Sequence, residues 1–210
     1  SKMNTWLLIN VVQQNNENDN MFAERLNLYK IAVKKHNKMI DENPYYDSGF
    51  DLFQPYLPEA MQSLQHMHTY KLGLGLQGAM YSIHNSISIT ELFIEPDLNH
   101  MLSKIGMYLN NGNLLPEPYK IHPRSSIFKK SFRLANSTGI IDTGYRGNLG
   151  ALIDNNNKLG TLPMEDRNKI VPHQRYFQIC KPDLKKFKVY IVDELPPTKR
   201  GEGGFGSTGE

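Results

Sequence analysis

A few polar side chains in the second half of the chain have the types and spacing that hydrolytic chemistry needs. Asp142 follows the apolar pair Ile140-Ile141 and precedes a Thr-Gly pair, so its carboxylate is expected at the tip of a hairpin. A carboxylate in that place can cap its own turn, or it can act as a general base toward an attacking water molecule. Tyr145, a little further along, can pack against the hairpin or present a rigid ring to a ligand.

Side chains suited to phosphate binding lie in two other stretches. The sequence HPRSS at 122–126 offers Arg124 as a planar fork of donors, with Ser125 and Ser126 as hydroxyl and backbone donors. The glycine-rich sequence RGEGGFGSTG at 200–209 favours a disordered terminus by composition. Yet its Arg200, Phe205, Ser207 and Thr208, set among glycines, also suit close wrapping around an anion and an aromatic ring. Because 24 basic and 21 acidic residues leave a net charge of only +3, any phosphate site must rely on local charge.

One carboxylate is the best candidate for metal binding. Mg²⁺ prefers oxygen ligands and keeps several waters, so Asp51 in the stretch DSGFDL, together with phosphate oxygens, would suffice. The pair His66 and His68 could suggest zinc, but no second cluster at ligand spacing accompanies it. A surface or strand role for these histidines is therefore favoured.

The first half of the chain predicts a strand followed by a long helix. Residues 5–12 form an apolar run that is typical of a buried strand. Apolar side chains at helical spacing predict an amphipathic helix over 21–41 that covers the core, capped by Asp19 or Asn20 and ended at Asn43-Pro44.

The remaining elements are expected to be short. Partial alternation predicts a strand over 82–93, and the stretch from Leu98 to Asn113 predicts a helix closed by Asn111-Gly112. After Pro123, short apolar segments separated by turn residues predict strands joined by tight turns. Examples are residues 147–154, 175–180 and 188–193.

Length and composition fit one domain over residues 1–210. The chain is 39% hydrophobic and 21% charged, which is enough apolar material for one core. Its single cysteine, Cys180, excludes an intrachain disulfide and suits a reducing compartment. No apolar run approaches the length of a bilayer span. We therefore expect a soluble cytoplasmic protein that binds neither membrane nor nucleic acid.

Read together and in order, five stretches resemble the five motifs of the trimeric dUTPase family, whose members hydrolyse dUTP to dUMP and pyrophosphate. They are DSGFDL at 47–52, HPRSS at 122–126, STGIIDTGYRG at 137–147, HQRYFQ at 173–178 and RGEGGFGSTG at 200–209. The third and fifth are the most specific. The resemblance runs from about residue 44 to the C-terminus, with 59–118 poorly matched, longer than usual and similar to insertions in dUTPases of large DNA viruses. A viral chain would be expected in the cytoplasm or the nucleus of the host cell.

The resemblance implies a role for each candidate residue in the third motif. Asp142 would activate the water that attacks the α-phosphorus, and Tyr145 would lie under the deoxyribose and leave no room for a 2′-hydroxyl. Asn136 and the backbone of Gly139, Ile140 and Ile141 would bind the uracil.

The other motifs would bind the phosphates and the metal. Arg124, Ser125, Ser126 and Gln178 would contact phosphate, and Asp51 would contact Mg²⁺ through water. Arg175 matches a position that more often makes structural ion pairs. The C-terminal arm, residues 199–210, would close over the substrate, with Arg200 on the phosphates, Phe205 on the uracil, and Gly206, Ser207 and Thr208 around the γ-phosphate.

The family fold implies a mainly β, jelly-roll-like (β-clip) subunit in a homotrimer. Each active site would lie at a subunit junction, with the phosphate motifs, the Asp142 hairpin and the arm coming from different copies. The helix at 21–41 and the insertion at 59–118 would decorate the subunit surface. Supply of dUMP and restriction of uracil in DNA would be the biological outcome.

Two departures from the family pattern keep alternatives open. Ser126 stands where glycine is common, and His173 and Gln174 replace a glycine and an acidic residue before Arg175. Because Arg-Ser-Ser also occurs in the related dCTP deaminases, deamination of dCTP is the nearest alternative activity. A non-catalytic nucleotide-binding or partner-binding module that keeps the fold is a second alternative.

Overall fold

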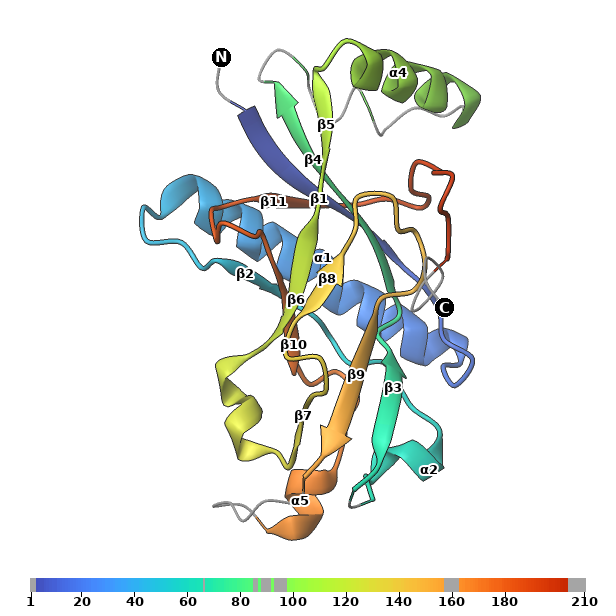
Figure 1. Ribbon diagram of the computed structural model, residues 1–210, viewed down its shortest axis with the longest axis vertical. Coiled ribbons are helices and arrows are strands. Elements are labelled where there is room, and N and C mark those ends of the chain that lie inside the picture. Colours follow the sequence, from blue (N-terminus) through green and yellow to red (C-terminus); the bar gives the residue numbers. More distant parts are fainter. Residues whose placement is uncertain are drawn as a thin grey trace.

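The computed structural model describes residues 3–65, 67–84, 87, 92, 98–156 and 163–203. As expected, the described fold is mainly β. Its strands form three sheets, with the orders β11-β1-β4-β5, β2-β10-β6-β8 and β3-β9-β7 (Figure 1). The strands are β1 Met3–Val11, β2 Gly49–Asp51, β3 Thr69–Gly73, β4 Leu76–His84, β5 Leu114–Glu117, β6 Tyr119–Pro123, β7 Phe132–Leu134, β8 Gly139–Ile141, β9 Gly150–Asn155, β10 Phe177–Cys180 and β11 Lys188–Ile191. The helices are α1 Asp19–Glu42, α2 Glu59–Gln62, α4 Leu98–Asn110, α5 Met164–Asn168 and the 3₁₀ helix η1 Ser125–Lys129.

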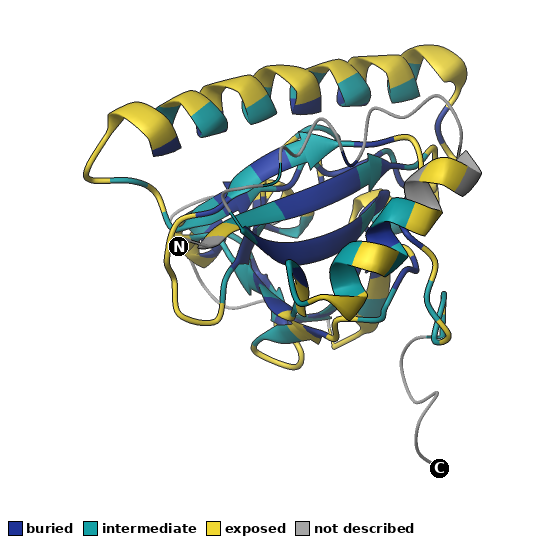
Figure 2. Cartoon of the chain, turned by 90° about the horizontal axis from the view of Figure 1, so that it is seen from above, coloured by how far each residue is buried: buried dark blue, intermediate teal, exposed yellow. Residues whose placement is uncertain are grey.

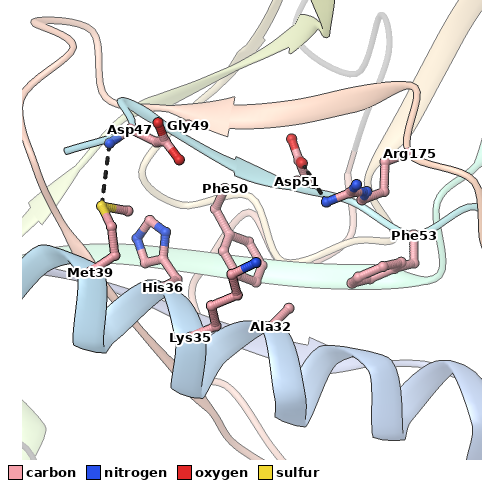
Figure 3. Close-up of a pocket in the computed structure, with 10 residues that line it drawn as sticks. All are labelled: Ala32, Lys35, His36, Met39, Asp47, Gly49, Phe50, Asp51, Phe53 and Arg175. Carbon is pink, nitrogen blue, oxygen red and sulfur yellow. Dashed lines mark hydrogen bonds and ion pairs between the residues drawn. The ribbon is translucent and has the colours of Figure 1, made fainter. Parts of the chain in front are cut away.

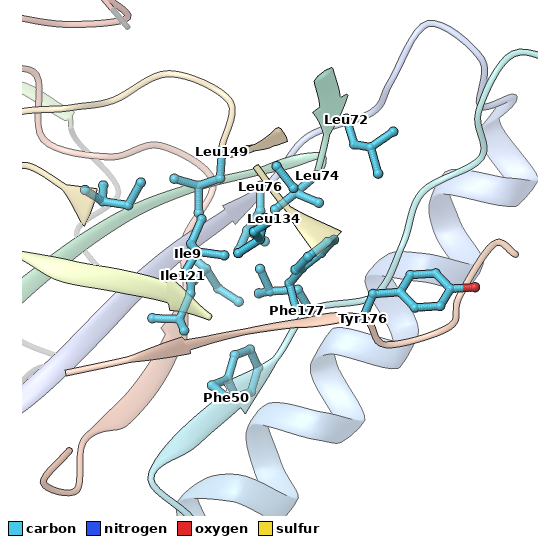
Figure 4. Packing of buried hydrophobic residues seen from close by; sticks show 14 of the residues in the cluster. Ile9, Phe50, Leu72, Leu74, Leu76, Ile121, Leu134, Leu149, Tyr176 and Phe177 are labelled. Carbon is cyan, nitrogen blue, oxygen red and sulfur yellow. The ribbon is translucent and has the colours of Figure 1, made fainter. Parts of the chain in front are cut away.

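Strand β1 is apolar on both faces because it lies between two cores. Leu7 and Ile9 belong to the larger cluster, and Figure 4 shows Ile9 among its side chains together with Phe50 and Ile121. Leu8, which points to the opposite face, packs with Ala79, Tyr81 and Ile83 of β4 in a second cluster. A strand covered on both sides needs such a continuous apolar run, which explains the pattern at residues 5–12.

Helix α1 covers one side of the sheets and leaves its outer face exposed (Figure 2). The predicted span is confirmed, but the cap is Asn18, whose side chain accepts a hydrogen bond from the Met21 amide at 2.9 Å, so the prediction of Asp19 or Asn20 is wrong. Its buried face also holds Arg25, which pairs with Glu17 at 2.7 Å. Neither side chain of this pair is exposed.

Helix α1 supports the strand that carries Asp51. The Tyr29 hydroxyl accepts a hydrogen bond from the Phe53 amide at 2.9 Å, and the His36 ring meets the Phe50 ring edge-on at 5.3 Å. Both contacts fix the residues on either side of Asp51. The expectation that this helix covers the core is confirmed.

The segment 59–118 was expected to decorate the surface, but part of it is buried. It contains β3 and β4, and β4 runs between β1 and β5 with most of its residues buried. The strand expected over 82–93 lies earlier, because β4 begins at Leu76 and ends at His84; residues 85, 86, 88–91 and 93 lie outside the described part. The helix expected from Leu98 is confirmed as α4, and Gly112 closes it with a φ of 75°.

The second half forms the short strands that the sequence predicts. Residues 147–154, 175–180 and 188–193 correspond to β9, β10 and β11. Strand β6 pairs with β10 on one side and with β8 on the other. This arrangement places three of the five sequence motifs next to one strand. Within the described residues, no helix has the length and apolar character needed to cross a membrane.

Candidate functional site

One cleft gathers the candidate phosphate-binding residues. Gln178 of β10 lies opposite Asp51 of β2 and opposite His122 of β6, so side chains at these positions share one face of the sheet. Arg124 and Ser125 follow directly where β6 ends and η1 begins. We call Asp51, Arg124, Ser125 and Gln178 the phosphate half-site. The cleft is lined by Asp47, Ser48, Gly49, Asp51, His122, Pro123, Arg124, Ser125, Gln178, Cys180 and Leu184.

Asp51 lies between two arginines. Its Oδ1 is 2.9 Å from Arg124 Nε. Its Oδ2 is 3.1 Å from Arg175 Nη1, a pair that Figure 3 shows. These side chains are partly exposed, so the pairs orient the guanidinium groups and add little stability. The contact of Arg175 with Asp51 is a structural ion pair of the kind that the resemblance implies.

This arrangement fits Mg²⁺ only when phosphate is present. The described residues contain no group of three or more His, Cys, Asp or Glu side chains that could hold a metal ion. His66, one of the two histidines considered for zinc, lies outside the described residues. The two arginines next to Asp51 also repel a bare cation. A triphosphate would supply both negative charge and oxygen ligands to the ion, and Asp51 would then contact an ion-bound water rather than the ion itself.

Gly49 controls the position of Gln178. Sequence reasoning missed this role of the glycine. A Cβ atom at Gly49 would lie 2.0 Å from Gln178 Oε1, far inside van der Waals contact. Gln178 also donates from Nε2 to the Pro123 carbonyl at 3.2 Å. The missing side chain at position 49 therefore leaves the space in which this amide sits. The glycine in the motif DSGFDL is the sequence signal that could have indicated this space.

A second group of residues lies on the turn that follows β8. The Tyr145 amide donates to the Asp142 carbonyl at 3.1 Å, which closes the turn, and the Asp142 side chain is 60% exposed. The Tyr145 hydroxyl donates to the Asn148 carbonyl at 2.9 Å, and partial burial raises the pKa of this phenol. Arg200 makes an ion pair with Asp142 and places its guanidinium 5.7 Å from the centre of the Tyr145 ring. We call Asp142, Tyr145 and Arg200 the hairpin half-site.

The base of the C-terminal arm is tied to this turn. The Arg146 amide donates to the Gly201 carbonyl at 2.7 Å, and the Thr198 hydroxyl donates to the Gly144 carbonyl. Arg200 is therefore held beside the hairpin of its own chain, whereas the resemblance implies that the hairpin and the arm of one site come from different copies. The other predicted arm residues, Phe205, Gly206, Ser207 and Thr208, lie outside the described residues.

The residues predicted to bind uracil lie beside the hairpin. Asn136 is exposed in the turn between β7 and β8, and Ser137 there has a φ of 61°. Strand β8, which contains Gly139, Ile140 and Ile141, is the last strand in its sheet order. An edge strand presents unpaired N–H and C=O groups. In the described chain, β8 thus offers a backbone edge to a ligand.

The two half-sites lie at opposite ends of β6. Ile141 pairs with Tyr119 near the start of this strand, whereas Arg124 follows its end at Pro123. At about 3.3 Å per residue, Arg124 and Asp142 are separated by about 20 Å along the strand. The structure therefore brings together Asp51, Arg124, Ser125 and Gln178, and separately Asp142, Tyr145 and Arg200, but does not join the two groups in one chain.

Known proteins identify the family. No family model matches the chain. The dUTPase of Alkaliphilus metalliredigens is 40% identical over 98 residues, which cover 45% of this chain and 63% of that protein. The dUTPase of Clostridioides difficile is 31% identical over 123 residues, which cover 58% of this chain and 79% of that protein. The chain belongs to the dUTPase family. A solved structure of a mutant of the Staphylococcus bacteriophage 80alpha dUTPase with dUpNHpp is 16% identical, with a TM-score of 0.39, and the match covers 97% of this chain and 98% of that one.

The extent of the match differs among these dUTPases. The chain spans less than two thirds of the Alkaliphilus metalliredigens relative, since 63% of that protein is covered. In the other direction, 45% of this chain is aligned, and the rest of it lies outside the match to that relative.

Proposed function

We propose that this dUTPase-family chain hydrolyses dUTP to dUMP and pyrophosphate at sites built between copies of itself. The observation that carries the proposal is the separation of two complementary half-sites on one strand. The phosphate half-site offers Arg124, Ser125 and Gln178 to a triphosphate, and the hairpin half-site offers an exposed carboxylate. Hydrogen bonds to phosphate and the approach of a nucleophile both need contacts of about 3 Å. Because about 20 Å of strand separates Arg124 from Asp142, we infer that one substrate cannot use both halves of a single chain.

A closed ring of copies resolves the separation. In a symmetric trimer, the phosphate half-site of each copy can face the hairpin of its neighbour, which gives three equivalent sites. The arm, which leaves the hairpin at Arg200, can then extend over a site that includes another copy. The family resemblance supports three as the number of copies.

In the proposed reaction, Asp142 takes a proton from a water molecule while the water oxygen forms a bond to the α-phosphorus. The bond between this phosphorus and the bridging oxygen breaks, and pyrophosphate leaves with the bonding electrons. Arg124, Ser125, Ser126 and Gln178 hold the phosphates in line and offset the charge of the transition state. Mg²⁺, when bound with the substrate and approached by Asp51 through water, would neutralise phosphate charge.

Substrate selection follows from the hairpin. The Tyr145 ring is held by its hydrogen bond to Asn148, so it can exclude a 2′-hydroxyl by contact. Asn136 and the β8 backbone would bind the uracil edge, and Phe205, Gly206, Ser207 and Thr208 of the arm would cover the base and the γ-phosphate. Arg200 would exchange its pairing with Asp142 for the phosphates when the substrate enters.

The first experiment compares Asp142→Asn with the parent protein in a pyrophosphate-release assay with dUTP and Mg²⁺. The substitution keeps the shape of the side chain and removes the base, so kcat should fall by about 10²-fold or more. Asp154→Asn, a carboxylate on β9 outside both half-sites, is the matched control and should retain parental kcat. An Asp142→Asn protein as active as the parent would disprove the assignment of the base.

A second candidate activity, deamination of dCTP, is favoured only by the Arg124-Ser125-Ser126 sequence. Incubation with dCTP distinguishes the two, because deamination releases ammonia and leaves the triphosphate intact. A non-catalytic module would bind dUTP without releasing pyrophosphate. Cys180 is a buried free thiol, and we infer on that ground a reducing compartment such as the cytoplasm.

A further inference from the structure

Arg146 is a buried cation that contacts the turn carrying Asp142 and Tyr145. Only 8% of the residue is exposed, and its guanidinium is bound by neutral oxygen atoms from three parts of the chain. Nη1 donates to the carbonyls of Thr143 and Tyr145 at 3.0 and 3.1 Å, which are the residues around the turn. Nε donates to the Pro196 carbonyl at 2.7 Å, at the start of the segment that leads to the arm.

The Tyr81 hydroxyl is the fourth hydrogen-bond acceptor of this guanidinium. Arg146 Nη2 donates to the Tyr81 hydroxyl at 2.9 Å. Tyr81 is 2% exposed and lies on β4, between Trp6 of β1 and Pro116 of β5 in the sheet register. Its hydroxyl is therefore fixed by a strand that is itself paired on both sides, and burial raises the pKa of the phenol.

We propose that Arg146 and Tyr81 are positioning residues, which fix the turn carrying Asp142 and Tyr145 against the rigid β4 strand and tie the base of the arm to the same point. This inference rests on the proposed function. It also gives a role to the segment 59–118, because that segment supplies Tyr81. The substrate does not need to touch either residue.

The chemistry of the guanidinium explains why arginine is used. Its planar fork can donate to several oxygens in fixed directions, whereas a lysine ammonium is a single point charge on a flexible stem. A lysine at 146 would keep the charge but would lose the simultaneous contacts with the turn, with Pro196 and with Tyr81. The turn would then move relative to a bound substrate, and small displacements of reacting groups reduce rates strongly.

Two variants test the proposal. Tyr81→Phe keeps the ring and removes one hydrogen bond to a charged group, so kcat/KM for dUTP should fall about three- to tenfold. In Arg146→Lys, kcat/KM for dUTP should fall at least about tenfold, and part of this loss should lie in kcat. Both should reduce the preference for dUTP over UTP, because the position of Tyr145 depends on the same turn. Tyr70→Phe, which removes a hydroxyl that accepts from the Gln65 amide at 2.8 Å, is the matched control and should change neither value.

Hydrogen exchange separates this proposal from the proposed function. Backbone amides of residues 142–147 should exchange faster in Tyr81→Phe and Arg146→Lys than in the parent and in Tyr70→Phe. If the parent does not hydrolyse dUTP, the proposed function fails, but the exchange result still tests whether Arg146 and Tyr81 fix the turn. Folded Tyr81→Phe and Arg146→Lys proteins with parental exchange at this turn, parental kinetics and parental selectivity would overturn the proposal. If Arg146→Lys does not fold, Tyr81→Phe alone decides.

Discussion

Replacement of Gly49 by alanine should weaken substrate binding through Gln178 while leaving the fold nearly unchanged. The new Cβ would lie 2.0 Å from Gln178 Oε1, 2.9 Å from its Cδ and 3.2 Å from Cys180 Sγ. Ordinary contact between carbon and other heavy atoms is about 3.5 Å or more, so the Gln178 amide has to move by more than about 1 Å. That movement breaks its bond to the Pro123 carbonyl and displaces it from the phosphate half-site.

The magnitude follows from the loss of one polar contact to a charged ligand. Such a contact is worth about 1.5–3 kcal/mol, which corresponds to about a 10- to 160-fold decrease in kcat/KM for dUTP. Stability should fall by less than about 1 kcal/mol, because the end of a flexible, partly exposed side chain gives way and the backbone does not. Steady-state kinetics and urea unfolding measure the two effects on the same samples.

A double-mutant cycle tests the reasoning. Gln178→Ala alone should lose the same contact, and adding Gly49→Ala to it should cost almost nothing more, since the displaced amide is already absent. Gly106→Ala is the control, because a Cβ there has no atom within 4 Å; it should leave kinetics unchanged and stabilise helix α4 slightly. If Gly49→Ala costs as much in the Gln178→Ala background as in the parent, the displacement of Gln178 is not the cause.

Three other results are expected. Glu17→Gln should lower the free energy of unfolding by about 3–5 kcal/mol, because it leaves the buried Arg25 guanidinium without its carboxylate; a loss below about 1 kcal/mol in urea unfolding would contradict this. Burial lowers the pKa of His36 below its usual value, so its contribution to stability is present above about pH 6.5 and is lost as the pH falls from there through the folded pKa; His36→Gln should flatten the pH dependence of unfolding in that window, and an unchanged profile would argue against it. Mg²⁺ should bind weakly to the protein alone and much more tightly with a non-hydrolysable dUTP analogue present, as measured by calorimetry; equal affinities would show a site formed by the protein itself.

The sequence predicted the elements whose patterns are local. The apolar run at 5–12, the helical spacing of Phe22, Leu26 and Tyr29, and the Asn-Gly stop after α4 each reflect the geometry of a single element. Strand β4 was placed wrongly, because its nearly continuous burial between β1 and β5 comes from sheet order, and its pattern therefore lacks alternation. Sequence spacing contains no information on that order.

The motifs indicated residues that lie close together within each half-site, but not how they are held. Asp51, Arg124 and Gln178 meet because their strands are neighbours in register, and a motif comparison can give this set without the geometry. The contact of Gly49 with Gln178 and the bond of Arg146 to Tyr81 depend on atoms far apart in sequence. The separation of the two half-sites along β6 likewise required the pairing of β6 with both β8 and β10.

Complementation between two inactive chains tests the shared site most directly. One chain carries Arg124→Ala and Gln178→Ala, which disable the phosphate half-site, and the other carries Asp142→Asn, which disables the hairpin half-site. Each alone should be inactive. After the two are unfolded together and refolded as mixed oligomers at equal amounts, about one quarter of the sites should combine an intact half from each chain. Recovery of dUTP hydrolysis near one quarter of the parental rate is the predicted result. Mixed oligomers without activity would contradict the account, because a site contained within one chain would remain defective in every copy.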